Sequence, residues 1–192
     1  NNIQTHVEGE APYSFLVYQQ VYDSNGTPIE GVYVDRNNDD IINDDDRYIK
    51  EDPFADIIMG LTNTVRCGSW DFSITARASI GNYAYNNVAS NAVLNQAWNS
   101  FQILNNVHSD YLTTGFQFTT ENSLLSDHYI QEASFVKIDN ISVGYTIPDF
   151  MGDCKLRFYG SIQNVCTFTD YNGLDPEIYG GIDNNFYPRP QT

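Results

Sequence analysis

The chain has 192 residues, 41% of them apolar, so it is long enough for one ordinary domain or for a piece of a larger one. Its 9 Lys and Arg residues against 25 Asp and Glu residues give a formal net charge of −16, which excludes nucleic acid as a main partner. Aromatic residues make up 14% of the chain and charged residues only 18%, a balance that opposes disorder and favours β-structure.

The first 54 residues contain an acidic segment, residues 35–46, whose spacing is typical of an EF-hand calcium loop. The candidate Ca²⁺ ligands are the side chains of Asp35, Asn37, Asp39, Asn43 and Asp46, and the backbone carbonyl of Ile41. Two positions depart from the pattern, because Asp40 stands where the turn prefers Gly and Asp46 stands where the pattern has Glu. A solvated acidic turn without metal uses the same residue types, so both interpretations stay open.

Residues 55–80 alternate between apolar and polar side chains, which predicts a β-hairpin. Every second residue from Trp70 to Ile80 is apolar, and the residues between them are mostly polar. The preceding residues 57–66 alternate less regularly, and Cys67-Gly68-Ser69 is predicted to form the tight turn between the two strands.

The next segment, residues 81–133, is longer than the connections of compact domains usually are, and such loops are usually functional. Its aromatic residues would suit stacking on sugar rings or contact with a partner protein. The favoured interpretation is that they form a small core of the loop's own. They are Tyr83, Tyr85, Trp98, Phe101, Tyr111, Phe116 and Phe118.

Residues 134–168 repeat the hairpin pattern. Apolar residues alternate with polar ones from Ile141 to Ile147, and this strand is predicted to end at Pro148. A short connection rich in turn formers leads to a return strand near residues 154–168. Residues 169–192 are expected to form a further loop.

Short turns at one end of the strands and long connections at the other are the asymmetry of an outer-membrane β-barrel, whose strands are apolar toward lipid and polar toward the lumen. The side chains expected to face lipid are Trp70, Phe72, Ile74, Ile141, Val143 and Leu156. Four strands cannot close a barrel, so we expect the chain to be stable only beside other strands. The alternative is a soluble cell-surface β-module, a sandwich that binds carbohydrate with or without Ca²⁺.

The cysteines and histidines predict no reactive centre. The three cysteines match no metal-ligand spacing, and the three histidines form no recognisable nucleophile–base arrangement, so we expect no enzyme activity. Cys67 and Cys154 both fall in short turns at the same predicted end of the strands. A disulfide between them is geometrically conceivable, but single thiols are the favoured interpretation.

The run from Ser126 to Pro148 resembles the C-terminal signature of the SusC/RagA-type TonB-dependent transporters. The run from Gln163 to Glu177 is similar to the next element of that family, and Tyr187-Pro188-Arg189-Pro190 to the segment that leads into its final strand. The matches keep their order and spacing from about Val7 to the end of the chain.

This resemblance implies an all-β fold, in which the chain supplies C-terminal antiparallel strands and long extracellular loops of a 22-stranded transmembrane barrel in the bacterial outer membrane. Residues 1–54, 81–133 and 169–192 would be the loops, the last leading to a closing strand that this chain does not include. The implied partners are a SusD-like lipoprotein lid, the TonB complex acting through N-terminal parts, an oligosaccharide or peptide substrate, and outer-membrane lipid.

Overall fold

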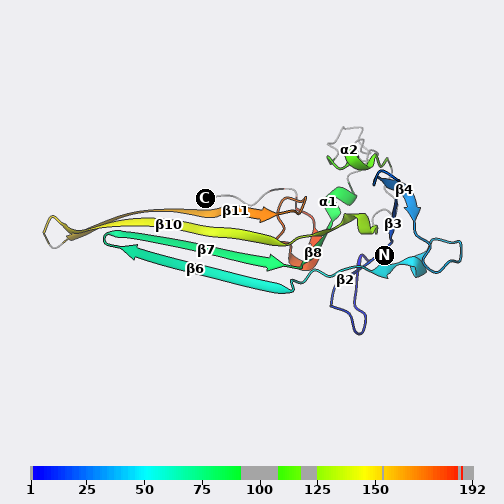
Figure 1. Ribbon diagram of the computed structural model, residues 1–192, viewed down its shortest axis with the longest axis horizontal. Helices are drawn as coiled ribbons and strands as arrows, with labels where there is room; N and C mark the ends of the chain where they lie inside the picture. The colour runs from blue at the N-terminus through cyan, green and yellow to red at the C-terminus, as the bar shows by residue number, and fades with distance from the viewer. Residues whose placement is uncertain (1, 92–107, 118–124, 153, 186, 188–192) are drawn as a thin grey trace, which may run out of the picture.

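The computed structural model describes residues 2–91, 108–117, 125–152, 154–185 and 187. Figure 1 shows a long sheet joined at one end to a group of short strands and helices. We call this group, formed by the described residues of 2–56, 81–134 and 170–187, the loop region. The opposite end of the sheet, which carries the two hairpin turns, is called the turn end.

Four long antiparallel strands form the sheet, in the order β11-β10-β7-β6. They are β6 (Ile57–Cys67), β7 (Trp70–Ile80), β10 (Phe135–Phe150) and β11 (Cys154–Thr169). These bounds confirm both predicted hairpins. Within the described residues the outer edges of β6 and β11 pair with no other strand, so the sheet is open, as expected of a piece of a barrel.

The expected end of β10 at Pro148 is wrong, because the strand continues to Phe150. The register between β10 and β11 shifts between Ile147 and Phe150, so Pro148 lies in an irregular part of the ladder. A proline is tolerated there because its missing N–H removes no regular ladder hydrogen bond.

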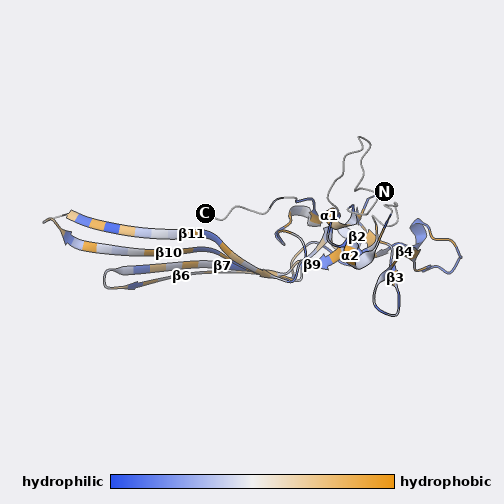
Figure 2. Ribbon diagram, turned by 90° about the horizontal axis from the view of Figure 1, so that it is seen from above, coloured by the Kyte–Doolittle hydropathy of each residue, from blue (hydrophilic) through white to orange (hydrophobic). Residues whose placement is uncertain are grey.

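The strand register gathers the apolar side chains on one face of the sheet. Trp70 pairs with Tyr145, and Phe72 pairs with Val143, and residues that pair directly in an antiparallel sheet project to the same side. The pairs Ile74–Ile141 and Ile147–Leu156 continue this face. Figure 2 shows the hydrophobic and hydrophilic residues alternating along β10 and β11, with no second sheet stacked on the four strands. The soluble sandwich is therefore not the fold of the described residues.

The loop region is built from short elements. Its strands are β1 (Gln4–Thr5), β2 (Ser14–Val17), β3 (Gln20–Tyr22), β4 (Pro28–Tyr33), β5 (Tyr48–Ile49), β8 (Tyr83–Asn86), β9 (Ile130–Glu132) and β12 (Ile182–Asp183). Its helical turns are η1 (Asp44–Asp46), α1 (Asn87–Ser90), α2 (Tyr111–Thr114), η3 (Asp127–Tyr129) and η4 (Tyr179–Gly181). No helix in the described part of the chain has the length and apolar character needed to cross a membrane.

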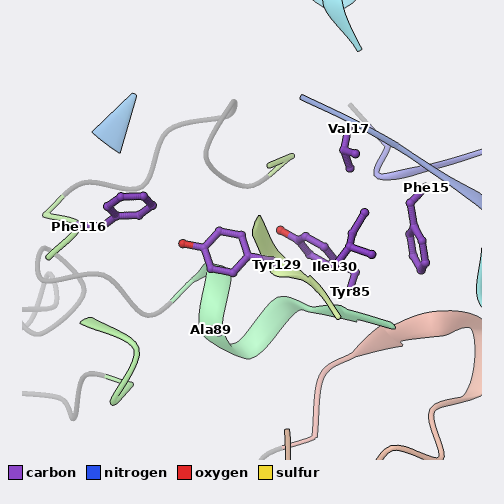
Figure 3. Close-up of a cluster of buried hydrophobic side chains, with 7 residues drawn as sticks. All are labelled: Phe15, Val17, Tyr85, Ala89, Phe116, Tyr129 and Ile130. Atoms are coloured by element: carbon purple, nitrogen blue, oxygen red, sulfur yellow. The ribbon is translucent and has the colours of Figure 1, made fainter. Parts of the chain in front are cut away.

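The main hydrophobic core lies in the loop region and joins two of the long segments (Figure 3). Tyr85 and Phe116, each 2% exposed, pack there, so these two aromatics are core residues as predicted, but the core is not the loop's own. Trp98, Phe101 and Phe118 lie outside the described residues. The same core contains Phe15 and Val17 of the first segment, a partnership that the sequence pattern did not predict.

Candidate functional site

The polar face of the sheet is lined mainly by neutral hydroxyl and amide side chains. Thr62 lies opposite Thr75 with 3.4 Å between their hydroxyl oxygens, and Thr64 lies opposite Ser73 at 3.5 Å. Further residues of this face are Asn140, Ser142, Ser161 and Gln163. Such groups both donate and accept hydrogen bonds, so this face suits contact with water and with uncharged polar solutes.

An ion-pair cluster lies on the polar face where the sheet meets the loop region. Arg77 Nε donates to both carboxylate oxygens of Asp139, at 3.0 and 2.9 Å, and the guanidinium also donates two hydrogen bonds to Glu177. Lys137 Nζ, on a side chain only 4% exposed, lies 3.4 Å from Glu177 Oε2. The segment after β11 is therefore tied back onto the polar face of the sheet.

Asp139 reaches this cluster because it forms a β-bulge. Ile138 pairs with Ala76 and Asn140 with Thr75, which leaves Asp139 without a pairing residue on β7. The sequence offered no signal for the link between Arg77 and Glu177, which are 100 residues apart and belong to no shared motif.

The acidic segment, residues 35–46, forms a closed loop in which the predicted side chains turn inward toward the backbone. The carboxylate of Asp35 accepts hydrogen bonds from the N–H groups of Asn38, Asp39 and Asp40. Asp39 Oδ1 accepts from the Ile41 N–H at 2.9 Å. At the other end, the fully buried Asp46 accepts from the N–H groups of Arg36, Asn37 and Asn43, at 2.8, 3.4 and 2.9 Å.

The remaining predicted ligands lie in the same loop. Asn37 Oδ1 accepts from the Asp39 N–H at 3.0 Å, and Asn43 Oδ1 accepts from the Asp45 N–H at 2.7 Å. The carbonyl oxygen of Ile41 lies 3.5 Å from Asn43 Nδ2. Asp40 adopts the left-handed conformation with φ 63°, which Asp tolerates better than most residues, so its departure from Gly does not prevent the turn.

The backbone of the acidic loop favours the ionised carboxylate of Asp46. The N–H of Asn43, with those of Arg36 and Asn37, lowers the pKa of Asp46 below its ordinary value. Within the described residues, no group of three or more His, Cys, Asp or Glu side chains is arranged to hold a metal ion. Of the six predicted Ca²⁺ ligands, three are Asp side chains, two are Asn side chains and one is a backbone carbonyl.

Asp127 connects the first long segment to the second. Its side chain, on a residue 6% exposed, accepts hydrogen bonds from the Gln20 N–H at 2.9 Å and the Tyr48 hydroxyl at 2.7 Å, and it pairs with Lys50 Nζ at 3.2 Å. Asp127 belongs to the run that resembles the transporter signature, so this part of the signature holds the loop region together.

The three cysteines are free thiols, and Cys67 and Cys154 are both exposed at the turn end. No disulfide joins them in this structure.

Comparison with known proteins identifies the class of protein to which the chain belongs. No family model matches the chain. TonB-dependent receptor SusC of Bacteroides thetaiotaomicron is 39% identical over 99% of this chain and 19% of its own length. TonB-dependent receptor P3 of Formosa agariphila is 31% identical over 93% of this chain and 20% of its own length. The chain thus spans about a fifth of the length of these relatives.

Solved structures show the same fold. A structure of the RagAB peptide transporter superposes with a TM-score of 0.68 at 18% identity, over 99% of this chain and 23% of that one. The RagAB peptide importer in an open-open state gives a TM-score of 0.65 over 93% of this chain and 21% of that one.

An open antiparallel sheet that is apolar on one face and polar on the other, with its long connections gathered at one end, is a segment of an outer-membrane β-barrel wall. The apolar face, with the six side chains predicted to face lipid, is accordingly the outer face of the barrel. The chain belongs to the SusC/RagA-type TonB-dependent transporters.

Proposed function

We propose that the complete protein imports oligosaccharides or peptides across the outer membrane, driven by TonB and assisted by a SusD-like lipoprotein that covers the barrel. The observation that carries this proposal is the hydrogen-bonding polar face of the sheet, mostly hydroxyl and amide side chains with paired charges, which would line a water-filled path. The 39% identity to SusC over nearly the whole chain supports it. The RagAB structures, at 16–18% identity, support the fold rather than a choice of substrate.

The outer part of the loop region would be the docking surface for the lipoprotein. The hairpin of β3 and β4 and the acidic loop lie far from the turn end (Figure 1). They expose apolar side chains, with Ile29 at 39%, Val32 at 42% and Ile41 at 61%. Tyr85 and Phe116 are committed to the core, so the contact would use these outer residues instead of those aromatics.

Affinity capture of the full-length transporter from its own outer membrane tests the docking surface. The double variant Ile29→Ser with Val32→Ser is expected to recover several-fold less lipoprotein than wild type, because it removes apolar contact area. Met151→Ser is the matched control, since Met151 is 85% exposed but lies at the turn end. Equal recovery with the double variant and wild type would overturn this docking surface.

Uptake tests the transport step separately. Growth on the imported nutrient is expected to stop when either the transporter or TonB is deleted, and to return with the matching gene. Growth that continues without TonB would overturn the proposed mechanism.

We also propose that the acidic loop binds Ca²⁺ through Asp35, Asn37, Asp39, Ile41, Asn43 and Asp46. The support is the all-oxygen ligand set, five side chains and one backbone carbonyl, which hard divalent cations prefer, and the closed loop that brings both ends together at Asp46. The bound ion would stabilise the outer end of the loop region, next to the hairpin of β3 and β4.

A further inference from the structure

Two cationic side chains on neighbouring strands hold a carboxylate that comes from elsewhere in the chain. Arg77 on β7 pairs with Lys137 on β10, so both side chains project from the polar face of the sheet. Glu177, which both of them contact, belongs to the loop-region segment that follows β11. The cations thus belong to the barrel wall, whereas the carboxylate belongs to a separate segment that lies over it.

The geometry of this contact is that of a carboxylate-binding site. The two terminal nitrogens of the Arg77 guanidinium each donate to one oxygen of Glu177, with 2.8 Å between Nη2 and Oε2. Arg77 Nε donates to Asp139, which orients the guanidinium. Lys137 Nζ approaches Glu177 Oε2 to 3.4 Å. A bidentate guanidinium beside an ammonium matches the planar carboxylate group itself, so the arrangement fits any carboxylate delivered to the same place.

Lys137 opposes removal of this carboxylate unless another anion replaces it. Its side chain is only 4% exposed, and among the described residues Glu177 is the only acidic group within ion-pair distance of it. Asp139 is paired with Arg77 instead. Withdrawing Glu177 alone would leave a buried ammonium without a counter-charge, which is strongly destabilising. An incoming carboxylate avoids this penalty, whereas a neutral solute does not.

A cavity of about 310 Å³ lies beside this contact. Arg77 and Glu177 both line it, and their side chains are 39% and 27% exposed. The rest of the lining is largely apolar and includes Phe54, Ile58 and Ile178. A charged end and apolar walls together suit a ligand in which a carboxylate is joined to an apolar group.

We propose that Arg77 and Lys137 form a site for the carboxylate of an imported solute, and that Glu177 occupies this site as an internal ligand until the solute displaces it. The inference rests on the proposed transport function, because it requires the solute to pass along the polar face. Once displaced, Glu177 no longer ties its segment to the wall, so binding at the site loosens the segment that follows β11. Peptide C-termini and acidic sugars both carry the required group, and the test distinguishes them.

The test uses the full-length transporter in detergent micelles and three probes: a peptide ending in leucine, the same peptide with a C-terminal amide, and a galacturonate oligosaccharide. Calorimetry should show the free-acid peptide binding at least tenfold more tightly than the amide. Hydrogen exchange in residues 170–185 should become at least tenfold faster when an acid is bound. The acid that binds more tightly, peptide or galacturonate, identifies the source of the carboxylate.

Glu177→Gln separates an internal ligand from a purely structural ion pair. A neutral amide competes poorly for two cations, so this variant should bind the acid at least tenfold more tightly than wild type does, whereas a structural role predicts no gain. Glu132→Gln is the matched control, because Glu132 is a loop-region acid that accepts from the Ser134 hydroxyl and does not line the cavity. It should bind as wild type does.

The inference is overturned if neither acid binds to wild type or to Glu177→Gln, or if the affinity is the same in both proteins. It is also overturned if the peptide binds equally well without its carboxylate. Each of these results would leave TonB-dependent uptake intact and the proposed function standing. Uptake without TonB would remove the proposed function whatever this site binds.

Discussion

Asp71 and Arg157 form an ion pair, with 2.7 Å between Oδ2 and Nη2, that crosses the intervening strand β10 on the polar face of the sheet. Asp71 lies on β7 and Arg157 on β11, and Gly144 of β10 lies beneath the pair. A Cβ atom added at Gly144 would stand 2.6 Å from the Asp71 carboxylate and 2.7 Å from the Arg157 guanidinium. The absence of a side chain at Gly144 is therefore what allows three strands to be joined by one ion pair.

Substituting Gly144→Ala in the full-length transporter should lower its stability by about 1–3 kcal/mol, because the new methyl group forces the two charged side chains apart. Urea unfolding in lipid vesicles measures this change. Gly160→Ala is the control, since Gly160 also lies within a long strand but has no atom within 4 Å of the added Cβ. Its stability should stay within about 0.5 kcal/mol of wild type. Equal effects of the two substitutions would show that the ion pair does not depend on Gly144.

The strands could be predicted from the sequence because each carries its own period-2 pattern, as from Trp70 to Ile80. The set of apolar side chains that share one face followed from the same pattern, since register transfers the face of one strand to the next. The continuation of β10 past Pro148 could not be predicted, because it depends on an irregular pairing with β11 that leaves no trace in composition.

The loop region was harder to predict because its contacts join residues far apart in the chain. Phe15 and Phe116 belong to one core, and Asp127 accepts a hydrogen bond from Gln20, yet none of these residues belongs to a periodic segment. Only the run that resembles the transporter signature pointed to Asp127, without indicating its partners. Local patterns specify local structure. A core built from several long connections forms only when all of these connections fold together.

His128 should make the loop region less stable in acid. Burial lowers its pKa below the ordinary value, although Asp110 and Asp127 oppose this shift and Lys50 supports it. The Tyr22 hydroxyl also faces the ring, 3.1 Å from Nδ1. Because the folded protein disfavours the charged imidazole, this stability is present above the unfolded-state pKa of about 6.5 and is lost as the pH falls through the lower folded-state value.

Hydrogen exchange of the loop region in the full-length protein, corrected for intrinsic rates, measures this effect between pH 7.5 and pH 5. The protection of backbone amides from exchange should fall on acidification in wild type and fall less in His128→Asn. The Asn amide can take the place of Nδ1 beside the Tyr22 hydroxyl but does not titrate. The same pH dependence in both proteins would assign the effect to other groups, such as the carboxylates.

The acidic loop should bind Ca²⁺ in a way that depends on Asp39 and not on Asp44. Asp39 occupies a ligand position of the predicted loop, while Asp44 has the same side chain and is also exposed but lies outside the ligand set. Tb³⁺ binding is measured by its luminescence in full-length protein treated with chelator, and Ca²⁺ should displace the bound Tb³⁺. Wild type and Asp44→Ala should bind Tb³⁺ with similar affinity, and Asp39→Ala should bind it at least tenfold more weakly. Equal losses in both variants would indicate loose attraction to an acidic surface.

Spin labels at Ser142 and Val143 test most directly that this sheet is a barrel wall, with lipid on one side and a water-filled lumen on the other. These neighbours on the central strand β10 pair with Ser73 and Phe72, on opposite faces of the sheet. Ser142→Cys and Val143→Cys would be made in a full-length transporter in vesicles, with the native cysteines replaced by Ser. The label at 143 should collide mainly with oxygen dissolved in lipid, and the label at 142 with a water-soluble nickel complex. Equal exposure of both labels to the nickel complex, or the reverse assignment, would contradict the account.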